Sequence, residues 1–432
     1  MNNFSNFCKY LKLDFTNFME KVLPKGINRP TKKFIYDMVY GLLKTGSTHI
    51  SEIARVLEPD NKLIHIEKRL TDNLSKLSLE SIHDSLIDFS LNNLCKKPLV
   101  IDVDESDIVK PHGHKFEKLG IIHDGSKESR PKEKGYNVTG IVSIGLENTV
   151  VPLLIKIYSS SENDYVSLTT NTIYHLTRVY SKTKERTITT FDRGYDGSIL
   201  MNEINQLGEK YVIRARSQRM YTIGNKHEAI DDICSRIKGK CSCCFTNSNG
   251  EKVIQKFSSI KPIHKDINHD FWLVVEVVNN DNDKRVYITN IDCSTKSNCE
   301  KVLKAYRMRW RIEEYFRFIK GEYGFEDFMV RKLKAINNLS LIIMIASTYI
   351  TKLTISKTKE YRYCLNAYAA FDKKSSTQEI VDKYGQNGLM LYRIKKGIQS
   401  ILAHSNSLPK VPGRDRVNRG YTQLSIFDLD KK

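Results

Sequence analysis

The sequence contains no long apolar run. No stretch reaches the roughly 18 consecutive apolar residues that a membrane-spanning helix needs, and the most apolar segment, residues 339–350, is interrupted by two serines. Residues 1–20 mix Asn, Lys, Asp and Phe and lack the apolar core of a signal peptide. We therefore expect a cytoplasmic protein that has no membrane partner.

The paired cysteines of a structural zinc site are also missing. The nine cysteines come without a secretion signal, which favours reduced thiols over a disulfide framework. Four of them cluster at Cys234, Cys241, Cys243 and Cys244, but the pattern C-x6-C-x-C-C lacks the two paired C-x2-C knuckles of a zinc site. We expect free thiols in a surface hairpin, and a zinc site is the less favoured alternative.

Acidic residues are scarce in the last third of the chain. Of the formal net charge of +19, residues 301–432 contribute +14, since they hold 26 Lys and Arg against 12 Asp and Glu. A local excess of positive charge favours a nucleic-acid-binding surface. The alternative is a composition rich in Lys, Asn and Ile that reflects an A·T-rich genome.

The first part of the chain has helical periodicity. Apolar residues recur at helical spacing within 32–43 and again within 82–94, which predicts a helical domain over residues 1–95. Residues 47–57 look like the opening of a helix-turn-helix motif. We expect this domain to bind DNA, with a plain helical bundle as the alternative.

A short apolar run ends in acidic residues near position 100. Residues 99–104 read Leu-Val-Ile-Asp-Val-Asp, and in a strand Asp102 and Asp104 point to the same side. An acid at the end of a buried strand can face solvent and a metal ion. We select Asp104, with Asp102 as its competitor and Asp107 as a supporting or solvated residue.

The same arrangement recurs farther along the chain. Residues 186–191 are rich in β-formers and lead into Asp192, which is followed by a turn that contains glycine. Asp192 is therefore the second candidate acid. Asp196 follows the glycine, and we interpret it as a turn or helix-cap residue.

The third candidate acid lies in a basic helical stretch. Residues 306–320 contain neither Gly nor Pro, so at 100° per residue they predict one continuous helix. One stripe of this helix, roughly 60° wide, carries four polar residues: Tyr306, Arg309, Glu313 and Lys320. The opposite side is mainly apolar and should be buried. From periodicity alone, the stripe could also be an ordinary solvated face.

The spacing of these four residues resembles a known signature. Y-x2-R-x3-E-x6-K is similar to the YREK signature of a large family of bacterial insertion-sequence transposases with a DDE catalytic triad. Asp104-Glu-Ser106 resembles the first acidic motif of that family, with Ser where Thr is frequent, and Asp192-Arg-Gly194 resembles the second. The resemblance implies a ribonuclease-H-like mixed α/β sheet flanked by helices. It also implies catalytic, metal-binding roles for Asp104, Asp192 and Glu313, and DNA-binding roles for Tyr306, Arg309 and Lys320.

The domain organisation follows from these motifs. We expect a catalytic domain over 96–355 with a β-rich insertion at about 205–295, and a basic, partly helical C-terminal region over 356–432. The resemblance places such an insertion against the transposon end. Trp272 in the insertion is a candidate for stacking on a base, although a Trp in an apolar strand usually belongs to the core.

Three gathered carboxylates repel one another unless cations are present, and hard oxygen ligands suit Mg²⁺, for which Mn²⁺ can substitute. We expect two ions, with cleavage and strand transfer at one site. The expected partners are double-stranded DNA, as terminal inverted repeats and as target, and a second copy of the chain on that DNA. The expected location is the bacterial cytoplasm, at the nucleoid. A nuclease without strand transfer and a catalytically silent DNA-binding protein are the alternatives.

Overall fold

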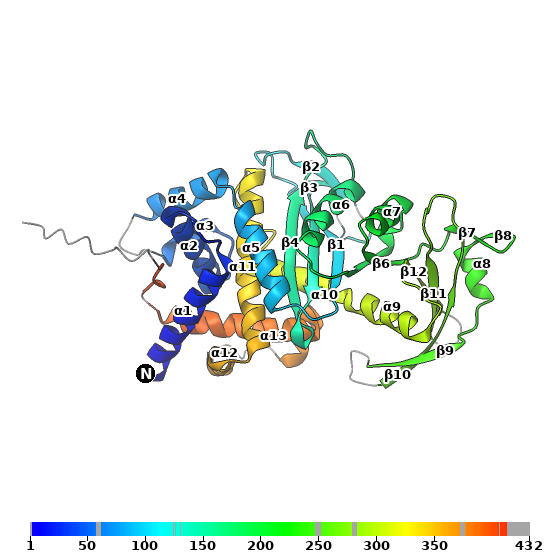
Figure 1. Cartoon of the computed structure of the whole chain (residues 1–432). Coiled ribbons are helices and arrows are strands. Elements are labelled where there is room, and N and C mark those ends of the chain that lie inside the picture. Colours follow the sequence, from blue (N-terminus) through cyan, green and yellow to red (C-terminus); the bar gives the residue numbers. More distant parts are fainter. Residues whose placement is uncertain are drawn as a thin grey trace, which may run out of the picture.

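The computed structural model describes residues 2–57, 62–123, 125, 127–129, 131–246, 252–278, 283–371, 376–405 and 407–412. Five helices come first along the chain and lie at one end of the molecule (Figure 1). They are α1 (Asn2–Val22), α2 (Arg29–Thr45), α3 (Ile50–Arg55), α4 (Leu63–Lys76) and α5 (Glu80–Asn93). The side chain of Asn28 caps the start of α2, and Gly46 ends it in a left-handed conformation.

The central sheet has a ribonuclease-H-like topology, as the sequence predicted. Its strands are β1 (Val100–Val109), β2 (Gly120–His123), β3 (Lys132–Ile144), β4 (Val150–Tyr158), β5 (Ile188–Phe191) and β6 (Lys210–Arg214). The long strands β4, β3 and β1 pair antiparallel, and β5 and β6 continue the sheet in parallel with β1. The crossovers into β5 and β6 carry helices α6 (Leu168–Tyr180) and α7 (Ser198–Gln206).

The two faces of the sheet are covered by different helices. Val103 and Ile141 on one face belong to the same core as residues of α6 and α7. On the other face, a Cβ on Gly140 would lie 2.5 Å from the ring of Phe316. Glycine at this position therefore allows the helix that carries Phe316 to approach the sheet closely.

A second group of strands extends the same sheet at the far end of the molecule (Figure 1). It contains β9 (Cys241–Thr246), β10 (Lys252–Ile260), β11 (Trp272–Val278) and β12 (Asp283–Thr289). Earlier in this segment, β7 (Met220–Ile223) and β8 (Lys226–Ala229) form a separate two-stranded sheet and are followed by α8 (Ile230–Ser235). β12 pairs with β6, so the sheet runs from the catalytic strands into the insertion without a break. The structure differs from the expected boundary in one point, because β6 lies within 205–295 yet is a central strand.

Five helices follow: α9 (Lys296–Met308), α10 (Trp310–Tyr323), α11 (Leu333–Ser356), α12 (Lys359–Phe371) and α13 (Thr377–Ala403). α11 is the one helix of the described residues that is long and apolar enough to cross a membrane, and 83% of its most apolar window is buried inside the protein. It is thus a core helix. The side chain of its Asn337 accepts a hydrogen bond from the Ile157 N–H and donates one to the Ile157 C=O, both at 2.9 Å. These two hydrogen bonds cover the edge of β4.

The C-terminal region packs against the catalytic helix. α13 contacts α10, and Lys395 forms a buried ion pair of 2.9 Å with Glu322 in the last turn of α10. The backbone of α13 turns to positive φ at Gly385, where a Cβ would lie 2.0 Å from Glu314. α12 and α13 are thus part of the folded body, and residues 413–432 of the expected basic region lie outside the described residues.

Candidate active site

Asp104 lies where the sheet changes its pairing. The parallel pairing of β1 with β5 ends at the pair Val103–Phe191, while β1 itself continues to Val109 against β3. The expectation that the strand ends at Asp104 was wrong, because it is the neighbouring strand that ends there. Asp104 is therefore uncovered on one side, with a side chain 19% exposed.

Asp102, the competing acid, is fully buried beneath Asp104. The Thr190 hydroxyl donates to its Oδ1 at 2.5 Å, and its Oδ2 has no hydrogen-bond partner among the described residues. Burial raises the pKa of Asp102 to about 7. This carboxyl group has no route to solvent in the structure, which leaves Asp104 as the accessible acid of β1.

Asp192 is the first residue after β5 and caps the short 3₁₀ helix η2 (Arg193–Tyr195). Val103 and Phe191 are paired, so Asp104 and Asp192 are the next residues of two neighbouring segments, at a place where the strands are about 5 Å apart across the sheet. The pKa of Asp104 is raised to about 7, mainly by burial; Arg309 lowers it, and the nearby charges of Glu313 and Asp192 contribute to raising it. The three predicted acids are thus electrostatic neighbours.

Arg309 lies between two of these acids. Its Nη1 is 3.4 Å from Asp104 Oδ2, and its Nη2 is 2.6 Å from Glu313 Oε1. The guanidinium is only 12% exposed, so its charge is weakly screened. Arg309 therefore neutralises much of the repulsion between the carboxylates in this structure.

The predicted continuous helix over 306–320 is wrong. α9 ends at Met308 and α10 begins at Trp310, with Arg309 as the residue between them. The Arg309 N–H donates to Tyr306 O, and the Ile312 N–H donates to Arg309 O, both in a tighter i→i−3 pattern. No Gly or Pro marks this break, so the sequence carried no signal of it.

The two outer residues of the signature lie on different helices. Tyr306 in α9 packs its ring against Tyr287 of β12 with centroids 4.5 Å apart, and burial raises the pKa of its phenol. Lys320 in α10 donates to the backbone carbonyl of Asp107 at 3.2 Å and pairs with Glu326 at 2.6 Å. Tyr306 is close enough to Asp192 to feel its charge, whereas the partners of Lys320 lie outside the three acids. Both side chains are already engaged with protein groups.

Glu105 is a residue that sequence reasoning missed. It points to the opposite face of β1 from Asp104 and accepts hydrogen bonds from the hydroxyls of Thr139, Tyr158 and Tyr195, at 2.6, 2.9 and 2.8 Å. Burial raises the pKa of Glu105 to about 8. Since Tyr195 is three residues after Asp192, Glu105 ties the strand of the first acid to the loop of the second.

The other residues singled out from the sequence belong to the fold rather than to the group of three acids. Asp196 is buried and accepts from the backbone N–H of Arg216 at 2.7 Å and from the Arg219 side chain, so it anchors a loop. The cysteines of β9 are free thiols. Trp272 packs against the core of the insertion. Trp310, by contrast, is 52% exposed beside Arg309.

The acids supply the oxygen donors that Mg²⁺ prefers. Among the described residues, no group of three Asp, Glu, His or Cys side chains is arranged as a ready metal site, and a guanidinium lies between Asp104 and Glu313. The donor set and the need for a positive charge therefore fit a divalent cation. Binding one through both carboxylates requires Arg309 to give up its ion pairs.

Comparisons with known proteins give one family match and a weaker structural likeness. Residues 96–349 match the family model described as a transposase DDE domain. No curated protein matches the chain. Among solved structures, a piggyBac transposase synaptic complex with hairpin DNA is similar, with 11% identity and a TM-score of 0.45, over 87% of this chain and 72% of that chain.

Proposed function

The chain belongs to the family of transposases with a DDE domain, and from this premise we propose that it moves a bacterial insertion sequence. In this proposal Asp104, Asp192 and Glu313 are the catalytic triad. The observation that supports it is that Asp104 on β1 and Glu313 on α10 share the Arg309 guanidinium, while Asp192 directly follows β5, the parallel neighbour of β1. The chain would act at the nucleoid, in the cytoplasm.

We propose that the triad holds two Mg²⁺ ions, or Mn²⁺ in their place. When bound, such ions activate an attacking oxygen and stabilise the leaving oxygen of a phosphodiester. First, water attacks a phosphodiester at the element's end and releases a 3′-hydroxyl. That hydroxyl then attacks a target phosphodiester, so one P–O bond forms as another breaks, and no covalent enzyme intermediate is needed.

The cationic side chains would bind the DNA backbone. Arg309 and Lys320 now pair with Glu313 and Glu326 at 2.6 Å, and a phosphate can take the place of either carboxylate as their partner. Tyr306 would contact a phosphate through its hydroxyl. These contacts, together with the basic composition of residues 301–432, predict binding that weakens as the salt concentration rises.

We further propose that the N-terminal helices recognise the terminal inverted repeats and that two copies assemble on DNA. The short α3, which follows α2 across Gly46, is consistent with the helix-turn-helix opening expected there. The insertion would lie against the transposon end. The YREK pattern supports placing the chain among insertion-sequence transposases of that subgroup.

The test is cleavage of a labelled duplex that carries the element's end, in Mg²⁺. The parent chain should cut at the end, whereas Glu313→Gln and Asp192→Asn should bind the duplex and not cut it. Cleaved ends without any joined product would instead indicate a nuclease. If all three proteins bind equally and none cuts even in Mn²⁺, the chain is a silent DNA-binding protein and the proposal fails.

A further inference from the structure

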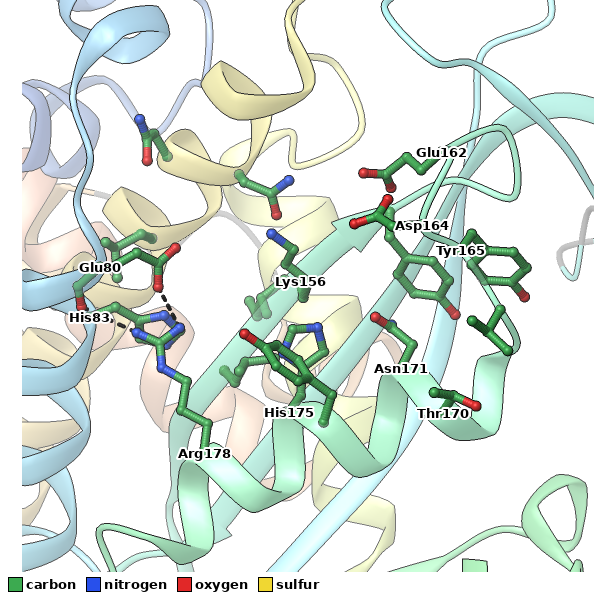
Figure 2. A pocket seen from close by; sticks show the side chains of 18 of the residues that line it. Glu80, His83, Lys156, Glu162, Asp164, Tyr165, Thr170, Asn171, His175 and Arg178 are labelled. Atoms are coloured by element: carbon green, nitrogen blue, oxygen red, sulfur yellow. Dashed lines mark hydrogen bonds and ion pairs between the residues drawn. The ribbon is translucent and has the colours of Figure 1, made fainter. Parts of the chain in front are cut away.

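A cavity of about 470 Å³ lies apart from the three acids, between α5, β4, α6 and α11. Figure 2 shows Lys156 and His175 in the middle of this cavity, with the Glu80–Arg178 pair on one side and Glu162 and Asp164 on the other. None of these side chains has a part in the chemistry proposed above. The cavity is therefore a second place on the molecule where a ligand could bind.

His175 has unused hydrogen-bonding capacity. It is only 5% exposed, and neither ring nitrogen has a hydrogen-bond partner among the described residues. The pKa of His175 is lowered to about 3, mainly by burial and in part by the nearby charges of Lys156 and Arg178, so its imidazole is neutral. A buried, unpartnered imidazole is costly unless a ligand or water satisfies it.

The floor of the cavity is electropositive. Arg178 is neutralised by Glu80 and Asp84, but the Lys156 ammonium has no ion-pair or hydrogen-bond partner in the part of the chain that the structure describes. Ser167, which caps α6, and Thr170 in its first turn also line the cavity. The N-terminus of this 13-residue helix adds a partial positive charge on the same side. An anion at this point would pair with the free ammonium.

The rim of the cavity is acidic and aromatic, in contrast to its floor. Glu162 and Asp164 provide carboxylate acceptors, and two tyrosine rings border the opening. The ring of Tyr165 is stacked on that of Tyr158, with centroids 5.9 Å apart, while Tyr174 is 70% exposed. The cavity thus offers one available cation and a neutral imidazole at its floor, acceptors at its rim and aromatic faces beside them.

We propose that this cavity binds a nucleotide, with its phosphate on Lys156 and His175 and its hydroxyl and amino donors on the acidic rim. A nucleotide combines one anionic group, several hydrogen-bond donors and a flat ring that stacks on tyrosine. A free phosphate ion would use only the floor. A ligand with cationic groups alone would leave Lys156 and His175 unpaired.

The test is calorimetric titration of the full chain with adenosine monophosphate, without DNA or divalent metal. We expect saturable binding that weakens by about tenfold in Lys156→Met and in His175→Leu. Lys184→Met, which removes an exposed lysine just beyond α6 and outside the cavity, should bind as the parent does. Circular dichroism of each variant establishes that it is folded.

Several outcomes would overturn the inference. One is the absence of saturable heat at about 5 mM nucleotide; another is equal affinity of the parent and Lys156→Met. If inorganic phosphate binds as tightly as adenosine monophosphate, the rim takes no part and the ligand is not a nucleotide. The result is independent of transposition, because Glu313→Gln should bind the nucleotide as the parent does even if no DNA is ever cut.

Discussion

The hydrogen bond from Tyr195 to Glu105 should control cleavage more than it controls stability. Glu105 accepts from Tyr195 at 2.8 Å and from Tyr158 at 2.9 Å, so Tyr195→Phe and Tyr158→Phe each remove one phenol donor from the same carboxyl group. Because burial raises the pKa of Glu105 to about 8, its carboxyl group is mostly neutral at pH 7, and a hydrogen bond between neutral groups contributes about 0.5–1.5 kcal/mol. Both variants should therefore lose a similar unfolding free energy, about 1 kcal/mol, because Glu105 keeps two donors.

Of these two hydrogen bonds, only the one from Tyr195 links the segments that carry Asp104 and Asp192. Tyr195 lies in η2, directly after Asp192, whereas Tyr158 lies at the end of β4, two strands away from β1. Loosening η2 should let Asp192 shift relative to Asp104, and small misplacements of this kind are costly in rate. We expect Tyr195→Phe to cut DNA about tenfold more slowly, equivalent to ~1.4 kcal/mol of activation free energy. Tyr158→Phe should cut nearly as fast as the parent.

The assay is single-turnover cleavage in Mg²⁺, together with DNA affinity and with Mn²⁺ affinity measured by electron paramagnetic resonance. Tyr195→Phe should bind DNA normally and bind Mn²⁺ more weakly, a result that a general loss of stability would not produce. Equal slowing in both variants would refute the reasoning, because it would mean that the number of hydrogen bonds to Glu105, rather than its link to η2, matters. Unchanged cleavage in Tyr195→Phe would refute it as well.

Three further predictions concern packing and buried charge. Gly140→Ala should lower the unfolding free energy by about 1–3 kcal/mol, since its Cβ would lie 2.5 Å from a ring of α10. Gly194→Ala is the control, because a Cβ there has nothing within 4 Å and should leave the unfolding free energy unchanged. Thermal denaturation compares the two variants. Burial tends to raise the pKa of Glu322, but Lys395 and its neighbours lower it overall. The pair should therefore stabilise the fold above about pH 4.5 and cease to do so as the pH falls through the depressed pKa. Lys395→Met should weaken that dependence in urea titrations at several pH values, because Lys396 and Tyr384 still contact Glu322. Asn337→Leu should cost about 2–4 kcal/mol, because two backbone groups of β4 lose their partners, and an unchanged urea midpoint would contradict this.

Much of the catalytic sheet could be predicted because its signals are local. A short apolar run that ends in an acid is read from adjacent residues, and this holds for Asp104 and Asp192 alike. The spacing of Arg309 and Glu313 placed them one turn apart, as their 2.6 Å contact requires. The partners of Glu105 could not be predicted, since its three hydroxyl donors come from positions 34 to 90 residues away.

The break at Arg309 shows where periodicity stops being informative. α9 buries its apolar side in the core of the insertion, together with Val274 and Tyr287, whereas α10 buries its own in the core shared with β3 and α11. Each half is amphipathic, so the sequence shows one continuous helical pattern of apolar residues. The two halves nevertheless bury their apolar sides in two different cores. The residue at the junction has neither core to enter, and its side chain is free to turn toward the two acids. Arg309 thus lies between Asp104 and Glu313 because the helix before it packs on the insertion and the helix after it packs on the catalytic sheet.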